Sequence, residues 1–507
     1  MRKSAITGLS RRNFVGALVG AAAGTVLAPL AKFYSRTAHA AEGKLCIANG
    51  SSAGFGPLQP ALARNAADLT ATIVGDLSNT PLLELPPGFS YTAVSITGAV
   101  MSDGTLVPGD HDGMACFQGR DGTYRLVRNH ELSPGEREFG NRTGVQPANG
   151  KVWDRFDLSE GEGGGGTTTL VLDREGLLVR DFASLGGTVR NCAGGPTPWR
   201  SWISCEENVS TPATDSDVRR RHGFCFEVPA DLEEGVEPIP IFGAGRFNHE
   251  AAAVDWETRF LYQTEDRGDS CFYRYVSHRR ASRFGDLQEG GSLYAMVIDP
   301  NIVSSCDGAP VPTIDRGSGI FSVDTRREFL SFLGQPLPVR WVLIERVNPA
   351  GDTLRYEAHA KGAALIERGE GAWYSAHGGG KIYFVATSGG DRGRGQVFVY
   401  DPKRETVTLV VESTRSTALI RPDNITVAPD GALYLCEDRG RSNRVIGVDR
   451  NGDVFPFLQN ARDNGEFAGA CFSPNGKFMY VNTQTVGITF AVFRNDRRSI
   501  RVHSGWT

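Results

Sequence analysis

The fold is decided by the stretch Glu250-Ala-Ala-Ala-Val-Asp255-Trp-Glu-Thr-Arg-Phe-Leu-Tyr262-Gln-Thr-Glu265-Asp266. An acidic residue begins a short apolar segment and a polar turn follows. A second apolar segment, which contains an aromatic residue, then ends in further acids. Two short apolar runs joined by a turn are typical of a β-hairpin. We therefore predict a hairpin over residues 250–266 with acids at both of its ends.

The same pattern recurs five more times along the chain, in residues 112–131, 191–207, 370–387, 423–438 and 466–483. The chain also has 62 glycines against 26 prolines, which favours a turn-rich β protein. Repeated hairpins indicate a β-propeller, in which blades of four strands surround an axis. A β-sandwich or two unrelated β domains is the alternative. We predict an all-β, six-bladed β-propeller.

Acids at hairpin ends predict a cation site. The start of the first strand and the end of the second strand of a hairpin lie at the same end, so the hairpins deliver carboxylates to one face around the axis. Like charges this close repel unless cations lie between them, and carboxylates suit hard cations such as calcium or ferric iron. Solvated loop carboxylates are the alternative. The candidates are Glu131, Glu206, Glu207, Glu250, Glu265, Glu370, Asp423, Glu437 and Glu466.

The charge of the chain argues against nucleic acid as a partner. The 507 residues carry a formal net charge of −4 at pH 7, and residues 1–40 contain six basic residues and no acid. Residues 41–507 are therefore strongly acidic, and an acidic body repels a phosphate backbone. Nine cysteines, with no CxxC pair among them, give no support to a structural zinc site.

The first forty residues read as a targeting segment. Ser10-Arg11-Arg12-Asn13-Phe14-Val15 is a twin-arginine motif, an apolar stretch extends to Leu30, and Ala38-His39-Ala40 is a cleavage signal. A retained membrane anchor is the alternative, but the apolar stretch is short and rich in Ala and Gly. We predict a signal peptide over residues 1–40, recognised by the twin-arginine export machinery. Residues 41–507 then form one propeller domain with loop insertions, periplasmic or secreted, without stable membrane insertion.

Several blocks of sequence resemble the PhoX-type alkaline phosphatases. They are Gly187–Trp199, Ser204–Glu207, Gly245–Ala251, Thr264–Gly268, Arg368–Gly371, Pro422–Asn424, Glu437-Asp438 and Glu466–Gly476. The resemblance implies a six-bladed propeller with a metal cluster at its central axis, containing Fe3+, two ions in that family, and several Ca2+ ions. One cysteine ligates iron in the family, and Asn191-Cys192 matches its cysteine block, so Cys192 is expected to be the iron ligand. A small buried hydrophobe is the other interpretation of Cys192.

The expected ligand set follows from the repeats and the resemblance together. The expected metal ligands are Cys192, Glu206, Glu250, Glu265, Glu370 and Glu437. Residues that either ligate metal or support a ligand are Glu131, Glu207, Asn191, His249, Asp423, Asn424 and Glu466. Glu206 and Glu207 are adjacent, so they point to opposite faces of a strand and only one is expected to bind metal; Glu206 is favoured.

Arg368 is the expected catalytic residue. It lies two positions before Glu370, so on an extended strand both face the same side. Its planar guanidinium suits a phosphoryl oxygen. An ion pair with a neighbouring acid is the alternative role of Arg368.

These expectations combine into hydrolysis of small phosphate monoesters by a metal-bound oxide or hydroxide. The alternatives are a calcium-dependent propeller lactonase or organophosphate hydrolase, and a non-catalytic propeller binding module stapled by calcium. The sequence leaves open the substrate range, the presence of the full iron–calcium cluster and the oligomeric state.

Overall fold

The computed structural model describes residues 54–136, 144–156, 164–302, 310–414, 419–450, 452–485 and 487–502. The predicted signal peptide lies outside these residues. Among the described residues, no helix is long and apolar enough to cross a membrane. The fold is all-β apart from α3 (Leu354–Ala360) and four short 3-10 segments in the described part. The prediction of an all-β, propeller-like fold is confirmed.

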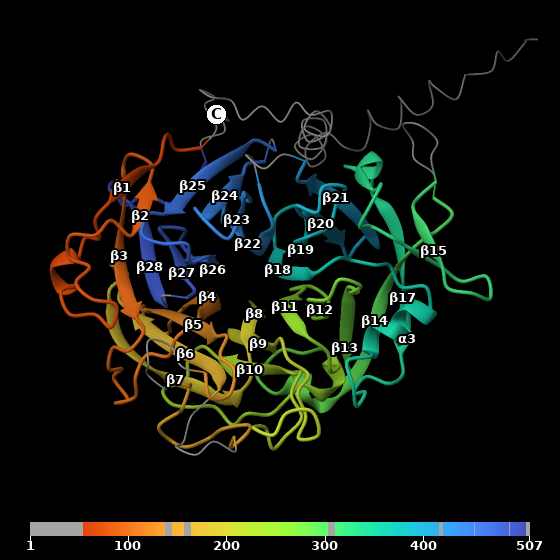
Figure 1. The fold of residues 1–507 in the computed structure, drawn as a ribbon, viewed down its shortest axis with the longest axis horizontal. Coiled ribbons are helices and arrows are strands. Elements are labelled where there is room, and N and C mark those ends of the chain that lie inside the picture. The colour runs from red at the N-terminus through yellow and green to blue at the C-terminus, as the bar shows by residue number, and fades with distance from the viewer. Residues whose placement is uncertain are drawn as a thin grey trace, which may run out of the picture.

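The strands form antiparallel sheets arranged around a common centre (Figure 1). One sheet holds β4 (His111–Gln118), β5 (Tyr124–His130), β6 (Gly165–Leu172) and β7 (Leu178–Thr188), and the next holds β8 (Asn191–Pro196), β9 (Ser201–Glu206) and β10 (Cys225–Pro229). A nine-stranded sheet follows in the order β11 (His249–Val254), β12 (Leu261–Glu265), β13 (Tyr273–Ser277), β14 (Gly291–Ile298), β17 (Leu337–Ile344), β21 (Thr406–Glu412), β20 (Gln396–Asp401), β19 (Lys381–Ala386) and β18 (Gly369–Ser375). The small hairpin of β15 (Thr313–Asp315) and β16 (Phe321–Val323) stands apart.

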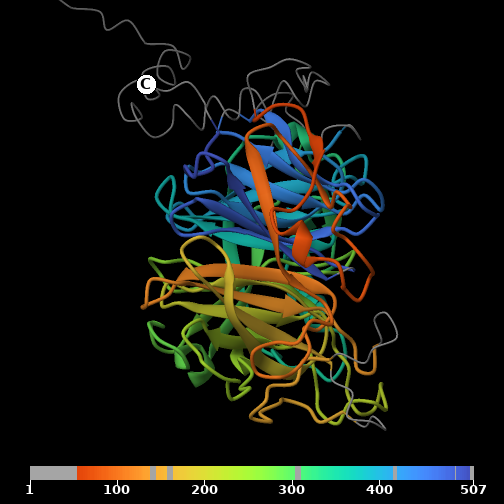
Figure 2. The ribbon, with the colours of Figure 1, turned by 90° about the vertical axis from the view of Figure 1, so that its left-hand side faces the viewer.

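Two further sheets close the ring. A six-stranded sheet has the order β1 (Gln59–Ala61), β2 (Leu83–Leu85), β25 (Val454–Asn460), β24 (Arg444–Val448), β23 (Leu433–Glu437) and β22 (Pro422–Val427). The last sheet has the order β26 (Phe467–Phe472), β27 (Phe478–Thr483), β28 (Ile488–Arg494) and β3 (Phe89–Ile96). Figure 2 shows the orange N-terminal strand against the blue C-terminal sheet. Pairing between strands from both ends of the described chain leaves no gap in the ring.

In the described part of the chain, six inner strands lie around the axis. They contact one another in the order β4, β8, β11, β18, β22, β26 and back to β4. Each pairs with the next strand in the sequence to form one of the predicted hairpins. The expected turns are present, since Gly431 and Gly476 have φ of +88° and +69°, a conformation that glycine adopts without strain. Apolar residues fill the space between neighbouring sheets, so the hairpin ends are held rigidly at the centre.

Candidate metal centre

Each inner strand has a β-bulge near its start. In β11, His249 lies opposite Glu265 and Ala252 lies opposite Gln263, so three steps along one strand match two along the other. The other five inner strands have the same irregularity. A bulge redirects a side chain out of the regular alternation. The second residue of each strand lines one cavity on the axis: Asp112, Cys192, Glu250, Glu370, Asp423 and Ala468.

A second set of residues comes from the ends of the partner strands. The backbone N–H of Glu207, which follows β9, donates to the carbonyl of Arg190 at 2.9 Å. Asp266 and Asp438 make the equivalent bonds in their hairpins, at 3.2 and 3.0 Å. The six residues in this position are Glu131, Glu207, Asp266, Thr387, Asp438 and Gln484. All except Thr387 line the same cavity. Two positions per hairpin therefore supply most of the site.

The cavity has a volume of about 170 Å³. Its acidic lining residues are Asp112, Glu131, Glu207, Glu250, Asp266, Glu370, Asp423, Asp438 and Glu466. Glycines just beyond the ligand positions let the inner strands converge. A Cβ on Gly371 would lie 2.7 Å from the backbone nitrogen of Ile425, and one on Gly113 would lie 2.5 Å from the Cα of Ala193. This close backbone approach brings carboxylates of different sheets within reach of a shared ion.

Among the residues that the structure describes, two groups of ligand atoms lie close enough to hold a metal ion. Cys192, Glu207 and Glu250 form one group, and Glu250, Glu370 and Asp423 form the other; in each, the ligand atoms lie within 4.8 Å of one another. The first group combines a thiol with two carboxylates, and the second contains oxygen ligands alone. Because Glu250 belongs to both groups, the two positions are adjacent.

The electrostatics of the cavity fit bound cations. Burial, followed by repulsion from Glu131, Glu250 and other acids, raises the pKa of Asp112 well above its ordinary range. Burial is also the main cause that raises the pKa of Glu131 to about 8. The Oδ1 atom of Asp112 is buried and has no hydrogen-bond partner. Carboxylates crowded out of water need positive charge to remain ionised, and the donor set present here therefore suits metal ions.

Among the described residues, two arginines line the cavity and bring positive charge to it. Arg190 pairs with Glu131 and, at 2.6 Å, with Glu207. Arg368 makes a two-pronged ion pair with Asp266, at 2.9 and 3.0 Å, and its Nη2 lies 2.8 Å from Glu370. Both side chains are nearly 40% exposed. Arg368 does share a side with Glu370, as expected, but it precedes β18 and has a φ of +52° instead of lying on an extended strand.

Glu206 does not line the cavity, which corrects the sequence-based preference for it over Glu207. Glu206 is fully buried, and its carboxylate accepts hydrogen bonds from the backbone N–H groups of Val189, Gly223 and Phe224 and bonds to His222 at 2.6 Å. Glu206 therefore stabilises the end of the β8–β9 hairpin, on the strand face that points away from the axis.

Glu265 and Glu437 correct the expected ligand set in the same way. Glu265 accepts a hydrogen bond from the Tyr273 hydroxyl at 2.7 Å and pairs with Arg355. Glu437 pairs with Arg444 at 2.7 Å. Each is the last residue of its strand, and successive strand residues point to opposite faces. The carboxylates that reach the cavity belong to the next residue of the chain in each case.

The remaining candidates divide between the cavity and its surroundings. Glu131, Glu207, Asp423 and Glu466 line it. Asn424 orients Asp423, because its Nδ2 donates to Asp423 Oδ1 at 2.8 Å. Asn191 donates to Ser204, and His249 is close to Cys225 Sγ at 3.3 Å, so both side chains are used inside the sheets.

Sequence reasoning missed Asp112, Arg190, Asp266, Asp438 and Gln484 as cavity residues. The amide of Gln484 donates to Asp112 and Glu131 at 2.9 and 2.6 Å. A signal was available for two of them, because Glu-Asp pairs end two hairpins just as Glu206-Glu207 ends a third. A consistent choice of the second acid of each pair would have found Asp266 and Asp438.

Comparison with known proteins identifies a family and a similar fold. The sequence model of the family described as alkaline phosphatase PhoX matches residues 73–181 and 175–487. PhoX of Pseudomonas fluorescens, solved in complex with vanadate, a transition state analogue, is similar in fold, with a TM-score of 0.62, 16% identity, and coverage of 89% of this chain and 99% of that chain. A gluconolactonase from Xanthomonas campestris matches with a TM-score of 0.37 and 11% identity over 88% of this chain and 99% of that one. No curated protein sequence matches. Because the family match spans most of the sequence, the chain belongs to the alkaline phosphatase PhoX family.

Proposed function

We propose that the axial cavity holds iron and calcium and that the chain uses them to hydrolyse small phosphate monoesters. Membership of the PhoX family supports a metal-dependent phosphatase. The observation that carries the metal assignment is the Cys192 thiol beside Glu207 and Glu250, within a cavity lined by carboxylates. Thiolates suit a transition metal and carboxylates suit calcium. Glu250, Glu370 and Asp423 would hold calcium, and Cys192, Glu207 and Glu250 would hold ferric iron.

The bound cations would neutralise charge on the phosphoryl group and lower the pKa of bound water. The work of the protein is to bind and orient the ester. Arg368 keeps Nε and Nη2 on Asp266 and Glu370, and no described residue bonds to its Nη1. The ion pairs fix the guanidinium plane, so its remaining N–H groups are preorganised to donate to a phosphoryl oxygen as negative charge develops there. Arg190 holds Glu131 and Glu207 in the same manner.

The six repeated hairpins and their six bulges support a six-bladed propeller in a single domain over residues 41–507. The nine-stranded sheet then consists of two blades, joined where Leu337 and Pro338 of β17 pair with β21. Export by the twin-arginine machinery, with removal of residues 1–40, is supported by the Ser10–Val15 motif. The family match favours a phosphatase over the lactonase and over a non-catalytic calcium-stapled module.

Cys192→Ser tests the proposal. The exported protein is assayed for iron, calcium, visible absorbance and turnover of 4-nitrophenyl phosphate. We expect Cys192→Ser to lose iron, the thiolate–iron absorption band and activity together. Cys271→Ser is the matched control, because Cys271 is equally buried but lies outside the cavity beside His359, and it should keep its metals. Iron-free, colourless wild-type protein with full phosphatase activity would contradict the iron assignment, and wild-type protein inactive on phosphate monoesters would contradict the function.

A further inference from the structure

A pocket rich in arginine lies outside the metal cavity. Its volume is about 480 Å³. We call it the basic pocket and define it by Trp153, Arg219, Arg220, Arg221 and Phe242. These residues come from the segment before β6, the loop between β9 and β10, and the 3-10 segment after β10. The size suits a small molecule, since ligand sites commonly enclose about 300–1,000 Å³.

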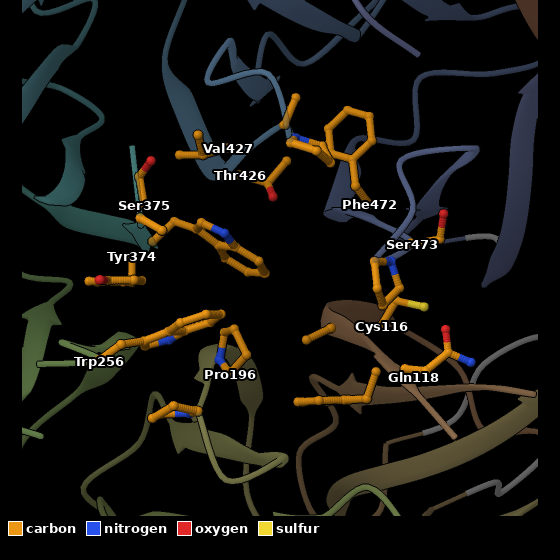
Figure 3. Close-up of a pocket in the computed structure, with 18 of the residues that line it drawn as sticks. Cys116, Gln118, Pro196, Trp256, Tyr374, Ser375, Thr426, Val427, Phe472 and Ser473 are labelled. Atoms are coloured by element: carbon orange, nitrogen blue, oxygen red, sulfur yellow. The ribbon is translucent and has the colours of Figure 1, made fainter. Parts of the chain in front are cut away.

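A larger cavity, of about 510 Å³, lies at the end of the inner strands opposite the metal centre. The strand β18 places Glu370 in the metal cavity and Tyr374 in this larger one (Figure 3). Its lining is mostly apolar, and the arginine in it, Arg200, pairs with Asp231 at 2.7 Å. Charge therefore gives little indication of a ligand there, whereas the basic pocket carries a clear one.

The loop that carries the three arginines is held by hydrogen bonds to its backbone. Oδ2 of Asp154 accepts from the backbone N–H groups of Arg219 and Arg220 at 2.8 and 2.9 Å. The indole N–H of Trp153 donates to the carbonyl of Arg221 at 3.3 Å. None of these contacts uses an arginine side chain. The loop is therefore ordered without neutralising the guanidinium groups.

Positive charge accumulates at the basic pocket. Arg220 and Arg221 are exposed, and neither has a carboxylate partner among the described residues. The guanidinium of Arg220 lies 4.6 Å from the ring centroid of Trp153, and that of Arg221 donates to backbone carbonyls of the loop after β17. Burial, followed by repulsion from Arg221, lowers the pKa of the nearby Arg246 to about 10. An anion bound beside these arginines would compensate this excess of positive charge.

An aromatic side chain supplies an apolar surface next to the arginines. Phe242 is 48% exposed. Its ring meets the rings of Phe224 and Trp153 edge-on, with centroids 5.1 and 6.4 Å apart. These contacts hold Phe242 in place while almost half of it remains accessible. A large apolar side chain left accessible in a concave site is typical of ligand binding.

Charge and aromatic surface together select the class of ligand. A cation would be repelled by Arg220 and Arg221. A small inorganic anion would pair with the arginines but leave Phe242 exposed. A neutral ring would cover Phe242 but leave the charges uncompensated. An anionic group carried on a flat ring satisfies both features.

We propose that the basic pocket binds an aromatic anion, whose negative group pairs with Arg220 and Arg221 and whose ring packs on Phe242. The pocket shares no residue with the metal cavity, so the proposal does not depend on the proposed function. Naphthalene-1-sulfonate is the probe, because it is charged at neutral pH and contains no phosphate ester. Naphthalene-1-sulfonamide has the same ring without the charge, and methanesulfonate has the charge without the ring.

Binding is measured by isothermal titration calorimetry on the metal-loaded exported protein. The sulfonate should bind more tightly than either comparison compound, and high salt should weaken it. Arg220→Gln should weaken its binding about three- to fivefold and reduce the preference over the sulfonamide, whereas Arg220→Lys should retain much of that preference. Phe242→Ala should weaken binding about tenfold.

Two matched controls lie outside the pocket. Arg498→Gln removes an exposed arginine, and Phe321→Ala removes an exposed phenylalanine of β16. Both should bind the sulfonate like the wild type. Turnover of 4-nitrophenyl phosphate should be unchanged in Arg220→Gln, in Phe242→Ala and in wild-type protein saturated with the sulfonate.

The proposal is overturned if naphthalene-1-sulfonate at millimolar concentration does not bind the intact protein. It is equally overturned if the sulfonamide or methanesulfonate binds as tightly, or if Arg220→Gln and Arg498→Gln bind the sulfonate alike. Competition between the sulfonate and the phosphate ester would place the ligand in the metal cavity and would also overturn it.

Discussion

Replacing Glu206 by Gln tests whether Glu206 and its neighbour Glu207 have different roles. Oε1 of Glu206 accepts from Val189 N at 3.0 Å and bonds to His222 at 2.6 Å, and Oε2 accepts from Gly223 N and Phe224 N at 2.8 and 3.0 Å. An amide has one accepting oxygen. Whichever way it is turned, its NH2 group faces two donors, and two hydrogen bonds are lost inside the protein.

The charges of Glu206 and His222 determine how much the substitution lowers the free energy of unfolding. Burial by itself lowers the pKa of His222, but the carboxylates of Glu206 and Asp154 outweigh it and raise that pKa to about 9, so the imidazole is positively charged at pH 7. Charge-assisted hydrogen bonds contribute about 1.5–3 kcal/mol each, and breaking a buried ion pair costs about 3–5 kcal/mol. We expect the free energy of unfolding to fall by about 3–5 kcal/mol, which lowers Tm by roughly 3–5 °C in a chain of this length.

The assay compares urea unfolding and metal content of Glu206→Gln with those of Glu207→Gln. Glu206→Gln should be destabilised with or without metals, because the hydrogen-bond partners of Glu206 lie outside the metal cavity. Glu207→Gln should lose bound metal, yet the metal-free variant should be no less stable than the metal-free wild type. The reason is that burial raises the pKa of Glu207, so its charge is unfavourable without cations. Metal loss in Glu206→Gln at unchanged metal-free stability, with metals retained in Glu207→Gln, would refute the assignment.

Three further outcomes follow from the same geometry. Arg368→Lys should keep the metals but reduce phosphatase turnover roughly thirty- to a thousand-fold, because an ammonium cannot replace a preorganised guanidinium; near-normal turnover would leave Arg368 with only its Asp266 ion pair. Chelation of calcium should abolish activity and lower Tm together, and an unchanged melting curve would show that the acids share no cation. Burial is the main cause that raises the pKa of Glu131 to about 8 and the pKa of Glu466 to about 9. The folded metal-free chain therefore retains protons on these two side chains that the unfolded chain releases near pH 4.5. Its free energy of unfolding should therefore fall as the pH rises from about 5 to 9, whereas a curve that rises over this range would contradict a crowded acidic cavity.

The repeated hairpins were predictable because their signal is local. Alternating apolar residues and Asp-Gly or Asn-Gly turns specify strand and turn within about twenty residues, as Gly431 and Gly476 show by their positive φ values. The convergence of acids on one face followed from the antiparallel geometry of a hairpin. Glu250, Glu370 and Asp423 were identified by this reasoning and do line the cavity.

Which acid of each pair faces the axis could not be predicted in the same way. Side chains alternate along a strand, so an error of one residue moves a carboxylate to the opposite face. The bulge at the start of each inner strand and the exact end of its partner decide that register, and neither leaves a clear mark in a single sequence. This is why Glu206, Glu265 and Glu437 were expected in the site that Glu207, Asp266 and Asp438 occupy.

The sequence by itself determined the all-β hairpins, the acidic character of the chain and the family-specific blocks around Cys192, because these depend on residues close together in the chain. The tertiary structure alone decided which side chains meet. It placed Arg190 between Glu131 and Glu207, and it closed the ring by pairing β3 with β28. It also formed a second cavity of about 510 Å³ from residues spread over 115–474, which no local pattern predicts. Contacts between distant segments depend on how the sheets pack around the axis, and that packing is a property of the whole chain.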